Sequence, residues 1–107
     1  MSNLSDLLQR AVANHEGGRL AEAETLYRQI LEQAPDDPDT LFLLGSLALQ
    51  TARPAAAADW IGQAIAAAPD DVPAEYHYNL GLACAGMGRP ADAAEHFRRA
   101  QIGRAHV

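Results

Sequence analysis

The sequence predicts an all-helical protein of three similar units, each a pair of helices. One set of residues recurs after 34 residues and again after a further 36, and no stretch shows the strict alternation of a strand. A period in this range is typical of stacked-repeat proteins, which usually build a binding surface. The recurring residues are Ala23, Tyr27, Ile30 and Pro35, then Ala57, Ile61, Ala64 and Pro69, then Ala93, Phe97 and Ala100.

The first unit shows the pattern of two amphipathic helices. Asn3 or Ser5 can cap the first helix, whose apolar residues recur every three or four positions until Gly17-Gly18 ends it. The second helix is expected over residues 20–33, and Pro35 follows it.

Prolines and short turns set the boundaries of the other two units. Their first helices are expected to start at Pro38 and near Pro73, and their second helices at Pro54 and Pro90. The turns within these units fall at 52–53 and 86–88. We expect the acidic pairs Asp36-Asp37 and Asp70-Asp71 to cap the helices that follow them.

Composition narrows the class of protein. The 107 residues suffice for one small domain, and the formal net charge is −6, with no lysine at all. Such a balance argues against nucleic acid and anionic membrane surfaces as partners. The single cysteine excludes an internal disulfide, and no signal peptide or membrane span is evident, so we expect a cytoplasmic protein.

The repeated residues resemble the tetratricopeptide repeat, a helix-turn-helix unit. The resemblance covers residues 4–101, with units at about 4–37, 38–71 and 74–101, and leaves 102–107 as a non-repeat tail. The family's small residue in the first helix matches Ala11, Gly45 and Gly81. Its small residue in the second helix matches Ala23, Ala57 and Ala93. Its large residue in the second helix matches Tyr27, Ile61 and Phe97.

The resemblance implies an α-solenoid in which three antiparallel helix pairs form a right-handed superhelix. In this family the small residues mark where the two helices of a unit touch, and the large one inserts beside the next unit. Two extra residues within 70–73 put the stacking angle between the second and third units in question.

The resemblance also implies a concave groove, lined by the first helices, that binds a protein or peptide. The groove positions of the family correspond to Leu8, Gln9, Val12, Phe42, Leu43, Ser46, Leu49, Tyr78, Asn79 and Leu82. The alternative for Leu8, Phe42 and Leu43 is burial against neighbouring units. Asn79 matches an asparagine that holds a bound peptide backbone in some relatives, and the alternative is a solvated or locally bonded amide. The arginines or lysines of a carboxylate clamp are absent from these positions.

No catalytic, metal or cofactor site is expected. His77 and Cys84 share a helical face, but zinc needs four ligands, usually in paired spacings, so both are interpreted as core residues. No nucleophile, base and orienting group converge in the sequence.

The sequence supports two hypotheses on function. The first is a non-catalytic interaction scaffold whose groove binds a peptide or helix of a partner. The second is the substrate-presenting N-terminal repeat region of a larger bacterial glycosyltransferase, sulfotransferase or methyltransferase. We also expect self-association through an uncapped last helix, with apolar surface at Ala93, Ala94, Phe97 and Ala100.

The last six residues depart from the repeat pattern. Their back-translation ATC GGA AGA GCA CAC GTC resembles a sequencing-adapter oligonucleotide. We therefore expect residues 102–107 to be a sequencing artefact and the natural protein to continue differently after Gln101; the alternative is a natural tail.

Overall fold

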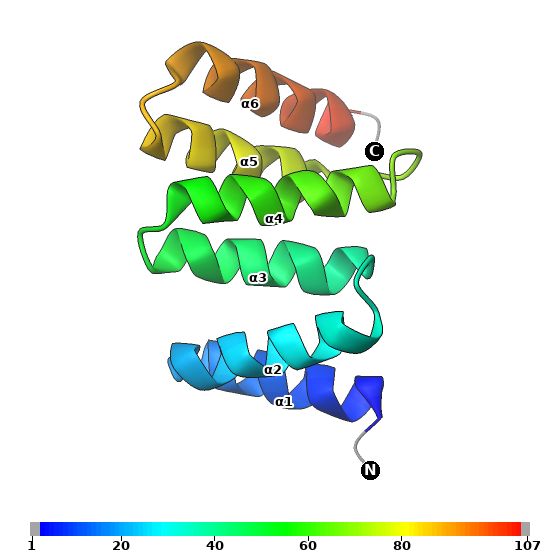
Figure 1. Cartoon of the computed structure of the whole chain (residues 1–107). Helices are drawn as coiled ribbons and strands as arrows, with labels where there is room; N and C mark the ends of the chain where they lie inside the picture. Colours follow the sequence, from blue (N-terminus) through cyan, green and yellow to red (C-terminus); the bar gives the residue numbers. More distant parts are fainter. Residues whose placement is uncertain (1–2, 106–107) are drawn as a thin grey trace.

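The chain folds into helices arranged as antiparallel pairs, as the sequence predicted (Figure 1). The computed structural model describes the backbone of residues 3–105 and the side chains of residues 3–101, and this backbone contains no strand. The helices are α1 (Leu4–Glu16), α2 (Leu20–Gln33), α3 (Pro38–Gln50), α4 (Pro54–Ala67), α5 (Ala74–Gly86) and α6 (Pro90–Ala105).

Side-chain caps fix the starts of two of the first helices. Asn3 Oδ1 accepts a hydrogen bond from the Asp6 backbone N–H at 2.7 Å, and Asp37 Oδ2 accepts one from the Thr40 N–H at 3.0 Å. These bonds satisfy N–H groups that have no partner within the helix. The predicted cap by Asp70-Asp71 is wrong: the residue before α5 is Pro73, which makes no side-chain cap bond. The two extra residues between these units separate the acidic pair from the helix.

The turns within the units share a left-handed residue at equivalent places. Gly18 and Gly88 have φ of 81° and 73°, and Ala52 has φ of 58° in the second unit. A left-handed conformation brings the Cβ of an L-residue close to the backbone, so Ala52 is strained where the two glycines are not.

The helix pairs stack into an elongated solenoid with extents of 44 × 28 × 21 Å. Each second helix packs against the first helix of the next unit, α2 on α3 and α4 on α5. In addition, α3 packs directly on α5, whereas no comparable contact joins α2 to α4 or α4 to α6 within residues 3–105. The first helices of the second and third units therefore contact each other directly, whereas no comparable contact joins α1 to α3 within residues 3–105. We call the layer of first helices, α1, α3 and α5, the inner layer.

The small residues allow the helices of a pair to close, as expected. Ala23, Ala57 and Ala93 are almost completely buried. Gly45 and Gly81, however, lie under the large side chains of their own units, Ile61 and Phe97. A Cβ on Gly45 would lie 2.5 Å from Ile61 Cγ1 and 3.3 Å from the Ala57 carbonyl oxygen. The predicted role of the large residue, insertion beside the next unit, is thus incomplete, because it also covers this glycine.

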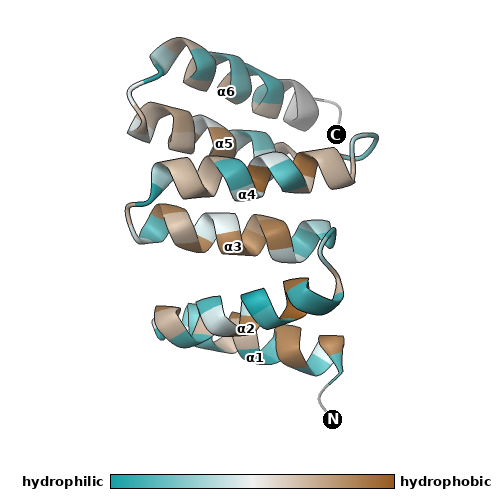
Figure 2. Ribbon diagram, in the orientation of Figure 1, coloured by the Kyte–Doolittle hydropathy of each residue, from teal (hydrophilic) through white to brown (hydrophobic). Residues whose placement is uncertain are grey.

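Two hydrophobic clusters share α3. One joins Leu44 and Leu47 of α3 to α1 and α2, and the other joins Leu41 and Ala48 of α3 to α4 and α5. Trp60 packs against both clusters. Apolar stretches accordingly run along α3 and α4, whereas much of α6 is hydrophilic (Figure 2). The core is continuous from one unit to the next, as stacking of repeats requires.

Polar contacts also tie the first unit to the second. The Glu24 carboxylate on α2 accepts a hydrogen bond from Arg53 Nη2 at 2.7 Å. Hydrogen bonding to Arg53 is the main cause that holds the pKa of Glu24 below its usual value. His15 bridges the same two units, because it contacts Tyr27 Oη at 2.8 Å and also Gln50 Oε1.

The last helix continues beyond the repeat pattern. The backbone of α6 is helical to Ala105, four residues into the segment interpreted as a non-repeat tail, and His106 and Val107 lie outside the described residues. The origin of this segment stays a prediction.

Candidate partner-binding groove

The inner layer positions all ten predicted groove residues on α1, α3 and α5. They differ in how much of each side chain reaches solvent. The exposed ones are Gln9, Tyr78 and Leu82; the half-buried ones are Leu8, Val12, Phe42, Leu43, Ser46, Leu49 and Asn79.

Four of the aliphatic and aromatic groove residues contribute to the core. Leu8 and Leu43 pack against the first hydrophobic cluster, and Phe42 and Leu49 against the second. The ring of Phe42 also stacks on buried Tyr76, with centroids 4.3 Å apart. The alternative of burial against neighbouring units therefore applies in part to Leu8, Phe42 and Leu43, which keep only part of their surface for a ligand.

The most accessible apolar surface of the inner layer lies on α5. Tyr78 and Leu82 are 43% and 40% exposed, and they lie four residues apart, on one face of the helix. We call these two residues the α5 patch. The Tyr78 ring contacts Phe97 of α6 with centroids 5.5 Å apart, and both residues line a cavity of about 330 Å³ with Ala100 and Gln101. The Phe97 ring thus packs against the Tyr78 ring.

Asn79 is held by the neighbouring unit. Its Nδ2 donates a hydrogen bond to Ser46 Oγ at 3.1 Å, and Ser46 Oγ donates to the Phe42 carbonyl oxygen at 3.0 Å. The Asn79 amide is therefore bonded within the protein, to a neighbouring unit and not locally as the alternative supposed. This bond uses one amide N–H that a bound peptide backbone would otherwise receive.

Tyr76 fixes an acidic side chain at the start of α3. The Tyr76 hydroxyl donates a hydrogen bond to Asp39 Oδ1 at 3.3 Å. Burial, reinforced by the Asp39 charge, raises the pKa of Tyr76 to about 12, so the hydroxyl keeps its proton at neutral pH. Asp39 itself remains exposed.

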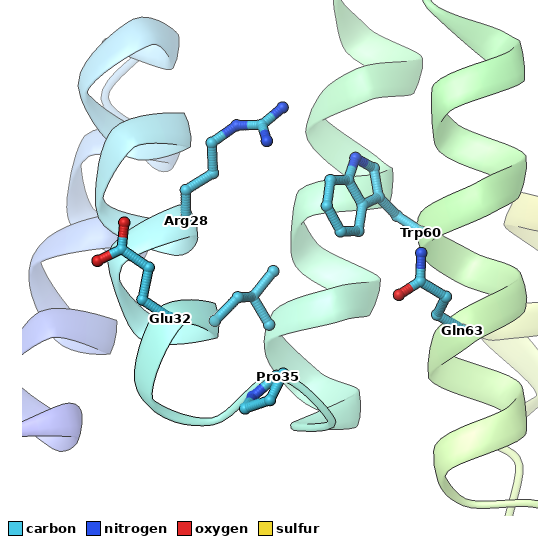
Figure 3. A pocket seen from close by; sticks show the side chains of 6 residues that line it. Arg28, Glu32, Pro35, Trp60 and Gln63 are labelled. Carbon is cyan, nitrogen blue, oxygen red and sulfur yellow. The ribbon is translucent and has the colours of Figure 1, made fainter.

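A second hollow lies between α2 and α4, outside the inner layer (Figure 3). It has a volume of about 360 Å³ and is lined by Arg28, Leu31, Glu32, Pro35, Trp60 and Gln63. The Arg28 guanidinium lies 5.4 Å from the centroid of the Trp60 ring. The sequence predicts a helix from Pro54 that includes Trp60, but it cannot reveal the hollow, because Arg28 and Trp60 on its two walls are 32 residues apart.

His77 faces a histidine and not a metal site. Its ring lies 6.1 Å from that of His96 on α6, nearly parallel to it, and the Nδ1 atoms of both are buried without a hydrogen-bond partner among the described residues. Burial lowers the pKa of both imidazoles, and Arg99 lowers each further. Cys84 is buried, and burial raises the pKa of its thiol. The side chains of residues 3–101 include no group of three or more that could hold a metal ion.

Comparison with protein-family models identifies the repeat. A tetratricopeptide repeat model matches residues 15–80, and a second one matches residues 74–101. The chain belongs to the tetratricopeptide repeat family. A search of curated protein sequences gave no significant match.

Solved tetratricopeptide repeat structures share the whole fold. MamA AMB-1 superposes with a TM-score of 0.86 at 20% identity, over 99% of this chain and 57% of that protein. A mutant of the Thermobaculum terrenum O-GlcNAc transferase superposes with a TM-score of 0.88 at 27% identity, over 98% of this chain and 21% of the enzyme. A double mutant of MamA RS-1 superposes with a TM-score of 0.83 at 26% identity, over 92% of this chain and 54% of that protein. This chain therefore spans between about a fifth and three fifths of these proteins.

Membership of this family indicates the general role of the domain. Tetratricopeptide repeats are typically non-catalytic scaffolds that bind protein partners, and the fold of this chain indicates that role. Within residues 3–105, no helix has both the length and the apolar character needed to cross a membrane.

Proposed function

We propose that the inner layer of this tetratricopeptide repeat domain binds a segment of a partner protein without catalysing a reaction on it. The observation that supports this role is the α5 patch. Tyr78 and Leu82 keep about two fifths of their surface exposed on the layer that faces inward, although large apolar side chains favour burial.

The α5 patch suits an anchoring role. Tyrosine gives a large contact area at a low cost in conformational entropy, and the tilted contact with Phe97 restrains its ring. Covering the exposed part of each side chain would contribute about 1 kcal/mol. The half-buried Phe42, Leu43 and Leu49 extend the apolar surface along α3.

Two substitutions separate binding from folding. Tyr78→Ala and Leu82→Ala should weaken capture of the partner about tenfold, since exposed anchors dominate binding, and should leave the melting temperature nearly unchanged. Gln33→Ala is the control, because Gln33 is exposed on α2, outside the inner layer. Equal affinity of the Tyr78→Ala protein and the unmodified chain would refute the assignment of the groove.

The second hypothesis, a repeat region that presents substrate to a catalytic domain, is favoured by one comparison. The Thermobaculum terrenum O-GlcNAc transferase is 27% identical over nearly all of this chain. We propose on this ground a glycosyltransferase as the enzyme to look for. Sequencing the gene downstream of the Gln101 codon tests it: an open frame encoding a transferase domain supports this hypothesis, and an early stop codon refutes it.

Self-association through α6 has less support than expected. The predicted exposed face is wrong for Ala93 and Ala100, which are each only 3% exposed. Ala94 is exposed and Phe97 is half-buried, so a smaller apolar surface remains. Sedimentation of the chain in the cytoplasmic pH range tests this proposal: dimers that dissociate on dilution support it, and a monomer at all concentrations refutes it.

A further inference from the structure

The inner layer carries acidic side chains and no arginine on two of its three helices. Asp39 and Glu75 lie in the first turns of α3 and α5, and both are exposed. These two helices carry no other aspartate or glutamate and no arginine or lysine, and His77 is their one histidine. The charges that α3 and α5 themselves present to a ligand are therefore carboxylates.

Each of these carboxylates is spaced to share a helical face with an aromatic ring. Asp39 precedes Phe42 by three residues, and Glu75 precedes Tyr78 by three. Side chains with this spacing are neighbours on one face of a helix. Leu82 continues the face of Glu75 and Tyr78 by one further turn. The face of α5 thus offers, in order, a negative charge, an aromatic ring and an aliphatic side chain.

The loops at the two edges of the stack also differ in charge. The loops that join α2 to α3 and α4 to α5 lie at one edge of the stack, and the turns within the units lie at the opposite edge (Figure 1). The two loops at the first edge carry the acidic pairs 36–37 and 70–71 and no arginine. The opposite edge carries one arginine in each turn, at Arg19, Arg53 and Arg89. Arg53 and Arg89 pair there with Glu24 and Asp92.

We propose, building on the proposed function, that the bound segment is basic and apolar. An arginine or lysine of the partner lies at the Glu75 carboxylate and over the face of Tyr78, and a neighbouring aliphatic side chain contacts Leu82. A guanidinium or ammonium group is stabilised both by a carboxylate and by the face of an aromatic ring. An acidic segment in the same place would meet Asp39 and Glu75 without any nearby cation on these helices.

A selection experiment identifies the chemistry of the bound segment before any partner is identified. A random peptide library displayed on phage is selected on the full chain, and phage that also bind the Tyr78→Ala protein are removed. The expected result is enrichment of peptides that join arginine or lysine to leucine or aromatic residues and lack aspartate and glutamate.

Charge-neutralising variants then locate the basic side chains. The double variant Asp39→Asn, Glu75→Gln should lower the affinity for an enriched peptide about three- to tenfold, as expected for exposed ion pairs. It should also reduce the dependence of this affinity on salt concentration. Glu22→Gln with Asp59→Asn is the matched control, since it changes the net charge equally on α2 and α4, where both residues are exposed. This control should change the affinity less than about twofold, because salt screens charges beyond about 8 Å.

The outcomes distinguish this inference from the proposed function. Enriched peptides that are neutral or acidic but still depend on Tyr78 would overturn the inference and leave the groove in place. Equal effects of the two double variants would also overturn it, because net charge alone would then explain the preference. Absence of any peptide that depends on Tyr78 would overturn both proposals.

Discussion

Gly45 offers the sharpest test of how the helix pairs are packed. A Cβ at this position would lie 2.5 Å from Ile61 Cγ1, whereas ordinary carbon contacts lie at about 3.5 to 4.0 Å. Ile61 is completely buried, so its side chain has little room to move. Overpacking of this kind costs about 1–3 kcal/mol, and alanine recovers about 1 kcal/mol of helix propensity over glycine. Gly45→Ala should therefore reduce the free energy of unfolding by about 0–2 kcal/mol.

The matched control is Gly62→Ala in α4. An added Cβ there would meet no atom within 4 Å, so only the gain in helix propensity remains, about 0.5–1 kcal/mol. The difference between the two substitutions isolates the steric cost, because the propensity gain is common to both. Urea unfolding followed by circular dichroism measures both values, and Gly62→Ala should raise the midpoint whereas Gly45→Ala lowers it or leaves it unchanged.

A double-mutant cycle with Ile61→Ala identifies the contact. Removing the Ile61 side chain should turn Gly45→Ala from destabilising to stabilising, with a coupling of about 1–3 kcal/mol between the two sites. If Gly45→Ala stabilised the unmodified protein as much as Gly62→Ala does, Ile61 would move freely. The explanation of why a glycine occupies this position would then be wrong.

Three further predictions concern stability. Ala52→Gly should raise the free energy of unfolding, measured in urea, by about 0.5–1 kcal/mol, because it relieves the strain of an alanine in the left-handed conformation. The control Ala94→Gly within α6 should lower it by about 1 kcal/mol. A lower free energy of unfolding for both variants would contradict the strain at Ala52. The His77–His96 pair should make stability fall as the pH decreases from 6.5 through their lowered pKa values, since the native state disfavours the charged imidazoles. The melting temperature of the unmodified protein should fall between pH 7 and pH 5, and that of the His77→Asn, His96→Asn double variant should hardly change. The same pH dependence in both proteins would refute the prediction. Glu24→Gln should cost about 1 kcal/mol or less at neutral pH, because the carboxylate bridges two arginines at the surface, and raising the salt concentration should reduce the difference.

Local patterns predicted the helices and the residues between paired helices. Repetition at a fixed period located Ala23, Ala57 and Ala93, and all three are buried. Proline and glycine predicted the helix limits because they act through the local backbone. The same local reasoning failed at Asp70-Asp71, where two extra residues separate the acidic pair from α5.

Exposure within the groove could not be predicted from the sequence. Phe42 and Tyr78 occupy equivalent positions in their units, yet Phe42 stacks on Tyr76 while Tyr78 remains largely exposed. The difference arises because Tyr76 of the third unit covers Phe42, whereas the described residues contain no fourth unit that could cover Tyr78. The same reason hid the hollow between Arg28 and Trp60, since it exists only when two units stack.

Mapping a selected peptide on the full chain by ¹H–¹⁵N NMR tests the central claim most directly, because the inner layer and the hollow around Trp60 lie on different helices. We expect the backbone amide shifts to move mainly in residues 74–86 and 38–50, and Tyr78→Ala to reduce these changes at the same peptide concentration. Shifts concentrated around Arg28, Leu31 and Trp60 would instead place the binding surface on α2 and α4 and contradict the account.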